Sequence, residues 1–270
     1  MIDFLIFSRN RPLQLHSLLA SMSKYISGNY SVSVLHRYDD DYQESLNEIK
    51  SEFVDVNFIE ESSFYDNVIN YLSKSNNAMS FLVDDIVFKK EVDIDHVAEI
   101  VHNNPSIICF SLRLGIHLKH CYTRNLSQRI PSGHVSHEFF IWEWAGADSD
   151  WGYPLSVDGH VFRHDDILSW SKKVAFNSPN QYEDALQSIL RYQPSFPNRC
   201  ACFVRSKLFN IPANRVQNDI NNRNEGFSAE KMLELWKEGY RINFHNFYDI
   251  SNESAHFAVE LQLTTLEKKC

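Results

Sequence analysis

The sequence has 270 residues, of which 43% are hydrophobic and 13% aromatic, and its formal net charge is -9. This composition supports a sizeable core and excludes a globally disordered, fibrous or low-complexity chain. Nucleic-acid-binding surfaces are usually basic. Because no block of Lys or Arg occurs, we expect no nucleic acid partner. The length suits one large domain or two small ones. Since no repeat or linker is evident, we expect a single domain with halves 1–115 and 116–270.

Strand and helix patterns alternate through the first half. The apolar run Ile2–Phe7 predicts a buried strand, and Pro12 then suits the first turn of a helix. Further strands are predicted at Ser31–Leu35, Val54–Ile59, Ala78–Val83 and Ile107–Leu114, with helices at Tyr42–Lys50, Phe64–Leu72 and Asp95–His102. Alternation with short connections predicts an α/β fold, Rossmann-like, with a mostly parallel central sheet and helices on both faces. The second half elaborates this sheet.

Two adjacent carboxylates, Asp84 and Asp85, directly follow the apolar run Phe81–Val83. Burying a free carboxylate is costly, so the pair should lie where the strand leaves the core, at the edge of the sheet where α/β folds bind ligands. Two hard oxygen ligands suit Mg²⁺ or Mn²⁺ together with phosphate oxygens. The alternative is a strand-end turn whose aspartates are solvated.

The polar segment Ser8–Pro12 leaves the first strand and enters the first helix. A helix N-terminus attracts anions, and Arg9 or Arg11 could add a cationic contact. We therefore expect an anion site at this strand end, with ordinary surface charge as the alternative.

Trp142, Trp144 and Trp151 lie close together in the second half, beside several carboxylates. Aromatic faces stack on sugars and bases, so the cluster predicts a platform for such a ligand. A satellite hydrophobic cluster is an equally good interpretation. Shortly afterwards, Gly159 between Asp158 and His160 would leave room for a ligand to approach the backbone.

Carboxylates recur at the starts of two predicted helices. Asp165 and Asp166 would cap the helix Ile167–Lys172. Glu183 and Asp184 fall in the first turn of the next helix, which we expect to begin at Glu183. There they favour the helix dipole, or one of them acts as a general base at a site mouth. Beyond them we expect strands at Cys200–Lys207 and Arg241–Phe247, a loop or lid at 210–226, and a helix at Ala229–Glu238.

The five cysteines are odd in number and lack the paired spacing of a zinc site. We expect reduced thiols and a cytoplasmic protein. No apolar run approaches the ~20 residues that cross a bilayer, and no signal peptide is evident, so any membrane association would be peripheral.

Three motifs together resemble the GT-A glycosyltransferases, and most closely the family 2-like bacterial enzymes. They are the Ser8–Pro12 segment, the acidic pair Asp84-Asp85-Ile86, and Tyr182-Glu183-Asp184, and the resemblance extends over residues 1–190. The family's strand-end DxD motif binds a metal and the donor diphosphate, and this chain departs from it because its second Asp is displaced. The family's later xED motif matches residues 182–184, where its carboxylate deprotonates the acceptor hydroxyl.

The resemblance implies transfer of a sugar from a nucleotide-diphosphate donor, most simply a UDP-sugar, with Mn²⁺ or Mg²⁺. The acceptor would be a glycan or lipid-linked hydroxyl in bacterial surface glycan synthesis, with 1–115 binding the nucleotide and 116–270 the sugar and acceptor. Motifs and resemblance together predict catalytic Asp184, Glu183 and Asp158, donor-binding Ser8, Arg9, Asn10, Arg11, Asp39, Asp84, Trp151 and His160, and metal ligands Asp84, Asp85 and His256, with His245 as the alternative histidine.

Three other classes of protein stay open. A nucleotidyltransferase usually has a Gly-rich loop after the first strand, which Ser8–Pro12 lacks. A metal-dependent hydrolase could use Asp158 and His160, although no H-E-x-x-H spacing is present. A carbohydrate-binding protein without catalytic activity could retain the same fold.

Overall fold

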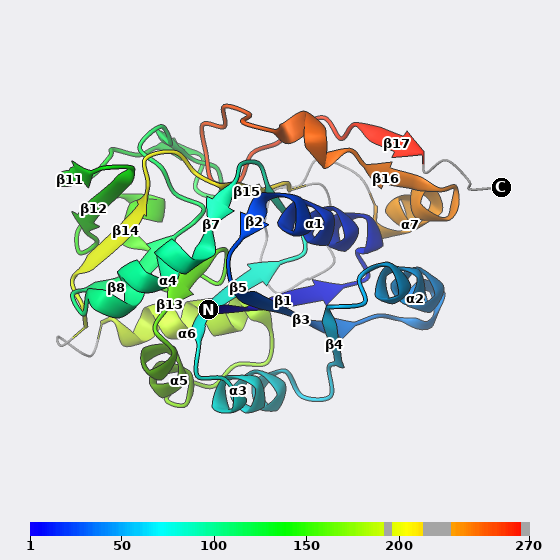
Figure 1. Ribbon diagram of the computed structural model, residues 1–270, viewed down its shortest axis with the longest axis horizontal. Helices are drawn as coiled ribbons and strands as arrows, with labels where there is room; N and C mark the ends of the chain where they lie inside the picture. The colour runs from blue at the N-terminus through cyan, green and yellow to red at the C-terminus, as the bar shows by residue number, and fades with distance from the viewer. Residues whose placement is uncertain (192–195, 213–227, 266–270) are drawn as a thin grey trace.

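The computed structural model describes residues 1–191, 196–212 and 228–265. A large mixed sheet forms its centre (Figure 1). The strands of this sheet are Ile2–Arg9 (β1), Tyr30–Arg37 (β3), Asn57–Glu60 (β4), Ala78–Val83 (β5), Ile107–Ser111 (β8), Gly133–Ser136 (β11), Phe139–Glu143 (β12), His160–Phe162 (β13) and Arg199–Phe203 (β14). Their order across the sheet is β11-β12-β14-β8-β13-β5-β1-β3-β4.

Helices and short two-stranded ladders surround this sheet. The helices are Pro12–Tyr25 (α1), Gln43–Glu52 (α2), Phe64–Lys74 (α3), Ile94–Asn103 (α4), His164–Ser171 (α5), Pro179–Ile189 (α6) and Ala229–Lys237 (α7), with 3₁₀ turns at Asp40–Tyr42 (η1), Ser149–Gly152 (η2) and Phe244–Phe247 (η3). The minor strands are Ile26–Ser27 (β2), Ile86–Phe88 (β6), Val92–Asp93 (β7), His120–Cys121 (β9), Leu126–Ser127 (β10), Leu208–Asn210 (β15), Tyr240–Ile242 (β16) and Leu263–Thr265 (β17).

Strand direction differs between the two halves of the sheet. β1, β3, β4 and β5 pair in parallel, as the strand–helix alternation predicts. β13 is antiparallel to both of its neighbours, β5 and β8, while β11 and β12 form an antiparallel hairpin that turns at His137, which has a positive φ. The α/β prediction is therefore confirmed. The sheet is mixed because β12 and β13 run antiparallel to their neighbours, whereas β14 pairs with β8 in parallel.

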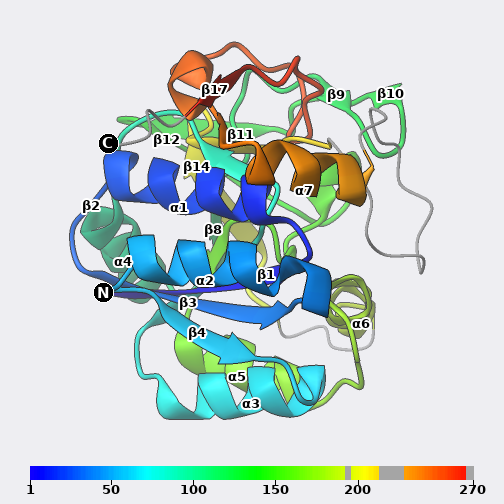
Figure 2. The ribbon, with the colours of Figure 1, turned by 90° about the vertical axis from the view of Figure 1, so that its right-hand side faces the viewer.

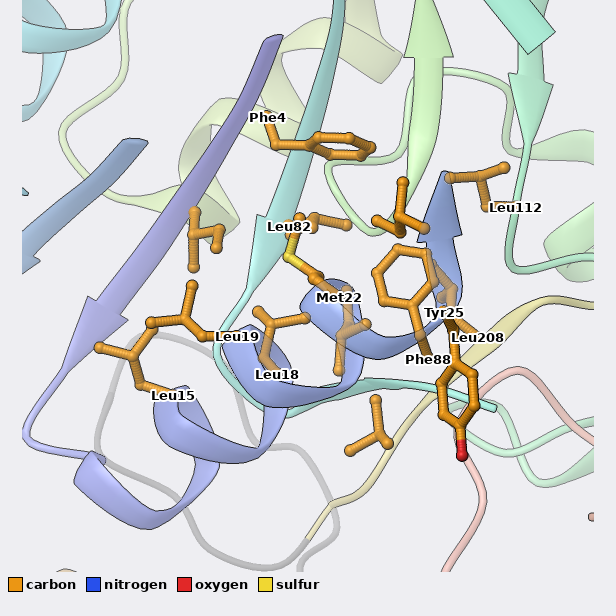
Figure 3. Packing of buried hydrophobic residues seen from close by; sticks show 14 of the residues in the cluster. Phe4, Leu15, Leu18, Leu19, Met22, Tyr25, Leu82, Phe88, Leu112 and Leu208 are labelled. Carbon is orange, nitrogen blue, oxygen red and sulfur yellow. The ribbon is translucent and has the colours of Figure 1, made fainter. Parts of the chain in front are cut away.

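Each face of the sheet has its own hydrophobic core. Figure 2 shows α1, α2 and α7 on one side of β1, β3 and β4, with α3 and α5 on the other. Leucines spaced three and four apart give α1 an apolar stripe, and Leu15, Leu18, Leu19 and Met22 pack toward Leu82 of β5 (Figure 3). The second core joins α3, α5 and α6 through Phe64, Val68, Leu72, Ile167, Trp170, Tyr182 and Leu186.

Several predicted boundaries are wrong for local reasons. Helix α6 begins earlier than expected, because the Ser178 hydroxyl accepts from the Gln181 amide and Pro179 fills the first turn. Glu183 and Asp184 therefore lie in its second turn. Arg163, rather than an aspartate, occupies the N-cap position of α5. The predicted strand Cys200–Lys207 ends early, because the chain bends after Phe203, and the next strand, β15, begins only at Leu208.

Trp142 and Trp151 belong to the core. Trp151 is fully buried and Trp142 is 3% exposed. Their rings pack edge to face at 4.9 Å, and the Trp142 indole N–H donates to the Trp151 carbonyl at 2.9 Å. Trp144 is partly buried and donates to the Pro197 carbonyl. Because buried rings cannot stack on a ligand, the platform prediction is wrong for this pair, and the hydrophobic-cluster interpretation is correct.

Four of the five cysteines lie in the part of the chain that the structure describes. Cys109, Cys121, Cys200 and Cys202 are free and buried, whereas Cys270 lies outside the described residues. So does the part of the predicted lid from 213 to 226. Within the described ranges, no helix combines the length and apolar character needed to cross a bilayer.

Replacing Trp151 by Ala should lower the free energy of unfolding by about 3–5 kcal/mol, because it removes a large buried ring and leaves a cavity. Urea denaturation measures this change. Trp144→Ala is the matched control and should cost clearly less, since its ring is only partly buried. Equal losses in the two variants would contradict the placement of Trp151 in the core.

Candidate functional site

A pocket of about 770 Å³ opens where β1, β3 and β5 end. Parallel strands place their carboxyl ends at one edge of a sheet, which is where α/β folds bind ligands, and the volume lies in the range of small-molecule sites. Residues from both halves of the chain line it. The predicted site residues among them are Ser8, Arg9, Arg11, Asp84, Asp85, Asp158, Glu183, Asp184 and His256.

Asp84 is 3% exposed and bound by three donors from the start of the chain. Its Oδ2 accepts from the Ser8 hydroxyl at 3.0 Å and from the Arg9 amide at 3.2 Å. Its Oδ1 accepts from Nη1 of Arg11 at 2.9 Å. The hydroxyls of Ser8 and Tyr38 are also 3.0 Å apart. Asp84 is therefore a buried anion whose charge is met by hydrogen bonds and one guanidinium.

Asp85 lies beside it with a weaker set of partners. Its Oδ1 accepts from Nδ2 of Asn210 at 3.0 Å, and its Oδ2 is 3.7 Å from Nη1 of Arg11. Burial raises the pKa of Asp85 to about 7, with Arg11 acting against the shift and the carboxylates of Asp84 and Asp158 adding to it. The pocket thus holds one carboxylate fixed by hydrogen bonds and one that burial and its neighbours discourage from ionising.

Asp158 forms a second buried ion pair on another wall of the pocket. Its Oδ2 accepts from Nη1 of Arg113 at 2.9 Å, and Nε2 of His256 lies 3.7 Å from the same oxygen. Arg113 is 3% exposed. Burial, followed by the charge of Arg113, lowers the pKa of His256, so its imidazole is neutral at neutral pH. His256 also stacks on the ring of Tyr122.

Glu183 and Asp184 on α6 differ in environment. Glu183 is partly buried, and burial together with the charge of Asp158 raises its pKa to about 8, while contacts with Arg113, Val157 and Ser156 act against the shift. Asp184 is exposed and lines the pocket. The neighbouring carboxylates therefore divide into one that is protonated over much of the neutral range and one open to solvent.

The predicted metal set does not come together. Within the described residues, no group of three His, Cys, Asp or Glu side chains is placed to share a metal ion. His256 pairs with Asp158, while Arg11 occupies the space beside Asp84 and Asp85. His245, in η3, is not among the residues that line the pocket. These side chains as placed do not fit Mn²⁺ or Mg²⁺, and we assign no chemical step to a metal.

Four of the predicted donor-binding residues lie outside the pocket lining. Asn10 and Asp39 bind each other, through Nδ2 to Oδ2 at 2.6 Å and the Asp39 amide to Oδ1 of Asn10 at 2.9 Å. His160 is 1% exposed and donates from Nδ1 to the Pro154 carbonyl, while Trp151 is in the core. The donor-binding assignments of His160 and Trp151 are therefore wrong, because neither side chain reaches the pocket.

The space expected above Gly159 is also filled. A Cβ at this glycine would lie 3.0 Å from the Leu208 side chain, and its φ of +75° suits glycine. The glycine therefore serves packing between β13 and β15 rather than approach of a ligand.

Three residues that hold polar side chains of the pocket in place were not predicted from the sequence. Arg113, Asn210 and Tyr38 hold Asp158, Asp85 and Ser8 respectively. Arg113 could have been found, because it is a single charged residue between Leu112 and Leu114. A charge inside an apolar run must have a buried partner.

Comparisons with known proteins agree with the motifs. No family model matches the sequence. Over 253 residues the chain is 26% identical to the bifunctional glycosyltransferase pgtA of Dictyostelium discoideum, an alignment that covers 82% of this chain and 33% of the relative. The chain therefore spans about a third of the length of the curated relative that it matches. This similarity confirms the resemblance to glycosyltransferases, and its bacterial character stays a prediction.

A structural comparison supports the fold. GalNAc-T7, solved with UDP, GalNAc and Mn²⁺, superposes with a TM-score of 0.52 at 9% identity, covering 78% of this chain and 43% of that one. TarS of S. aureus gives a TM-score of 0.49 at 12% identity, covering 77% and 36%. The likeness to GalNAc-T7 confirms the fold class: a mixed α/β fold similar to that of the GT-A glycosyltransferases.

Glu183→Gln should make stability less dependent on pH. The raised pKa means that unfolded Glu183 loses its proton near its ordinary value while folded Glu183 keeps it to about pH 8. The wild-type protein therefore loses stability from this group as the pH rises from about 4.5 to 8. The thermal midpoint of the variant, relative to wild type, should rise across that window and level off above it.

Asp184→Asn is the matched control, because it changes an exposed neighbour on the same helix. It should leave the slope of midpoint against pH close to that of wild type. A slope for Glu183→Gln that equals that of wild type would show that Glu183 is ordinarily solvated.

Proposed function

We propose that this chain is a glycosyltransferase that moves a sugar from a nucleoside-diphosphate donor to a hydroxyl acceptor. One observation carries the proposal: a single pocket combines arginines at the ends of β1 and β3 with the carboxylate of Asp184 on α6. The first group suits an anionic diphosphate, and the second suits proton removal from a hydroxyl. The similarity to a glycosyltransferase over 82% of the chain supports the same reading.

The donor would bind at the strand ends. Arg9 and Arg37 are Cα partners on β1 and β3, and both line the pocket. Guanidinium groups bind phosphate oxygens with two parallel hydrogen bonds. Helix α1 begins beside them at Pro12, so its N-terminal dipole adds to the positive potential. A leaving diphosphate would therefore meet fixed positive charge at this end.

The acceptor would bind beside α6. Asp184 is the exposed carboxylate of the pair, whereas Asp158 is held by Arg113. A general base must reach the hydroxyl that it deprotonates, which favours Asp184 and leaves Glu183 and Asp158 to position it. The lining at this end is polar and aromatic, as a hydroxyl-rich glycan or lipid-linked glycan acceptor requires: Tyr122, Thr123, Ser149, Asp150, Tyr153, Asn177, Ser178 and Asn180.

The proposed transfer assigns no role to the metal ion that the resemblance implies. Arg11 already pairs with Asp84 and lies beside Asp85, and the side chains of the described residues do not assemble a shared metal site. Every role above belongs to a residue of the chain.

Donor binding can be tested by a thermal-shift screen of UDP-, GDP- and CMP-sugars against their nucleoside monophosphates. A ligand that binds only the folded state adds about 2.7 kcal/mol at a hundred times its Kd, so a true donor should raise the midpoint clearly. Arg9→Gln should weaken that shift by removing a guanidinium. If no nucleotide sugar raises the midpoint, the proposed function fails.

Asp184→Asn should lower the rate of sugar transfer by about 10²–10⁴-fold and leave donor binding nearly intact, because an amide cannot accept the proton. Turnover is measured once a donor is known, and calorimetry reports donor affinity. Asp165→Asn is the matched control, since Asp165 is 99% exposed on α5 and does not line the pocket. Full transfer activity in Asp184→Asn would assign the base to another residue.

A further inference from the structure

All four carboxylate oxygens of the acidic pair already face a protein donor. Arg11 contacts Oδ1 of Asp84 at 2.9 Å and lies 3.7 Å from Oδ2 of Asp85. The other oxygens accept from Ser8, the Arg9 amide and Asn210. A single guanidinium therefore stands between the two carboxylates, at the position where a shared cation would neutralise both.

Burial makes this arrangement hard to displace. The side chains of Arg11, Asp84 and Asp85 are 12%, 4% and 17% exposed. A divalent ion entering between the carboxylates would have to expel the guanidinium and leave a buried cation without its partners, which is strongly unfavourable. The ion would also need several further oxygen ligands, and among the residues that the structure describes no third acidic or histidine group converges on the pair.

The backbone on either side of Arg11 also restricts its position. Arg11 is the N-cap residue of α1, and Pro12 fixes the first turn of that helix. The β1 strand ends at Arg9, whose amide binds Asp84. Only one residue separates Arg9 from Arg11, so a short and constrained segment positions the guanidinium beside the two carboxylates.

We propose that Arg11 takes the place of a divalent cation at Asp84 and Asp85, so that this acidic pair binds a guanidinium and not Mn²⁺ or Mg²⁺. The proposal concerns the protein alone and does not rest on the proposed donor or acceptor. Arg11 is in this sense a positioning residue, because it fixes the two carboxylates at the pocket wall.

The test uses Mn²⁺ alone, added to protein that has been stripped with a chelator. Binding is measured as loss of the electron paramagnetic resonance signal of the free aqueous ion. Wild-type protein should bind no stoichiometric Mn²⁺. Arg11→Gln vacates the guanidinium position and leaves both carboxylates, so it should gain a site for one ion. Adding Asp85→Asn to Arg11→Gln should remove that site.

Arg37→Gln is the matched control. It removes the same charge from the same pocket, but Arg37 is exposed on β3 and the acidic pair keeps its guanidinium. It should bind no more Mn²⁺ than wild type, which separates loss of Arg11 from a general rise in negative potential.

Two results would overturn the proposal: stoichiometric Mn²⁺ binding by wild type that Asp85→Asn abolishes, or a folded Arg11→Gln, checked by circular dichroism, that gains no Mn²⁺. If Arg11→Gln does not fold, the comparison of wild type with Asp85→Asn still decides the matter. These Mn²⁺ measurements contain no nucleotide. A negative result would therefore refute the role of Arg11 without bearing on the proposed sugar transfer, which the nucleotide-sugar screen tests.

Discussion

The pocket depends on how one buried negative charge is satisfied. Asp84 ends β5 inside the protein, and it is tolerated there because Ser8, the Arg9 amide and Arg11 all donate to it. These donors come from the end of β1 and the start of α1, so a single carboxylate ties two neighbouring strand ends to the helix that covers them. The wall of the pocket is fixed by this need to compensate charge, and Asp85 is left beside it with fewer partners.

The first half of the fold could be predicted because local patterns decide it. The apolar run Ala78–Val83 coincides with β5, since two carboxylates end it abruptly, and the leucine spacing after Pro12 predicts α1. The second half was less predictable. β13 and β15 are three-residue strands whose partners lie far away in the sequence, and segments so short have no period of their own.

The site divides in the same way. Its carboxylates could be found, because adjacent acidic residues behind an apolar run must sit at a boundary. Their pairing with Arg11, Arg113 and Asn210 could not, since these residues reach the carboxylates only through the fold. The donor-binding predictions for Trp151 and His160 were wrong because the sequence does not show which way a side chain points. Aromatic residues near carboxylates suit a ligand platform and a core equally well, and only the face on which each side chain lies distinguishes the two.

The position of β13 has a consequence for how the protein assembles. This strand is the single link between the four strands from β4 to β5 and the four from β8 to β11. Until residues 160–162 have been synthesised, the inner edges of β5 and β8 have no partner, although both strands are complete by residue 111. Unpaired inner edges invite pairing with other chains, and contacts so distant in sequence form slowly. The nascent chain therefore passes through a period in which β5 has one unpaired edge and β8 has no partner on either side, since its other neighbour β14 follows only at residues 199–203. A chaperone would be of most use during that period.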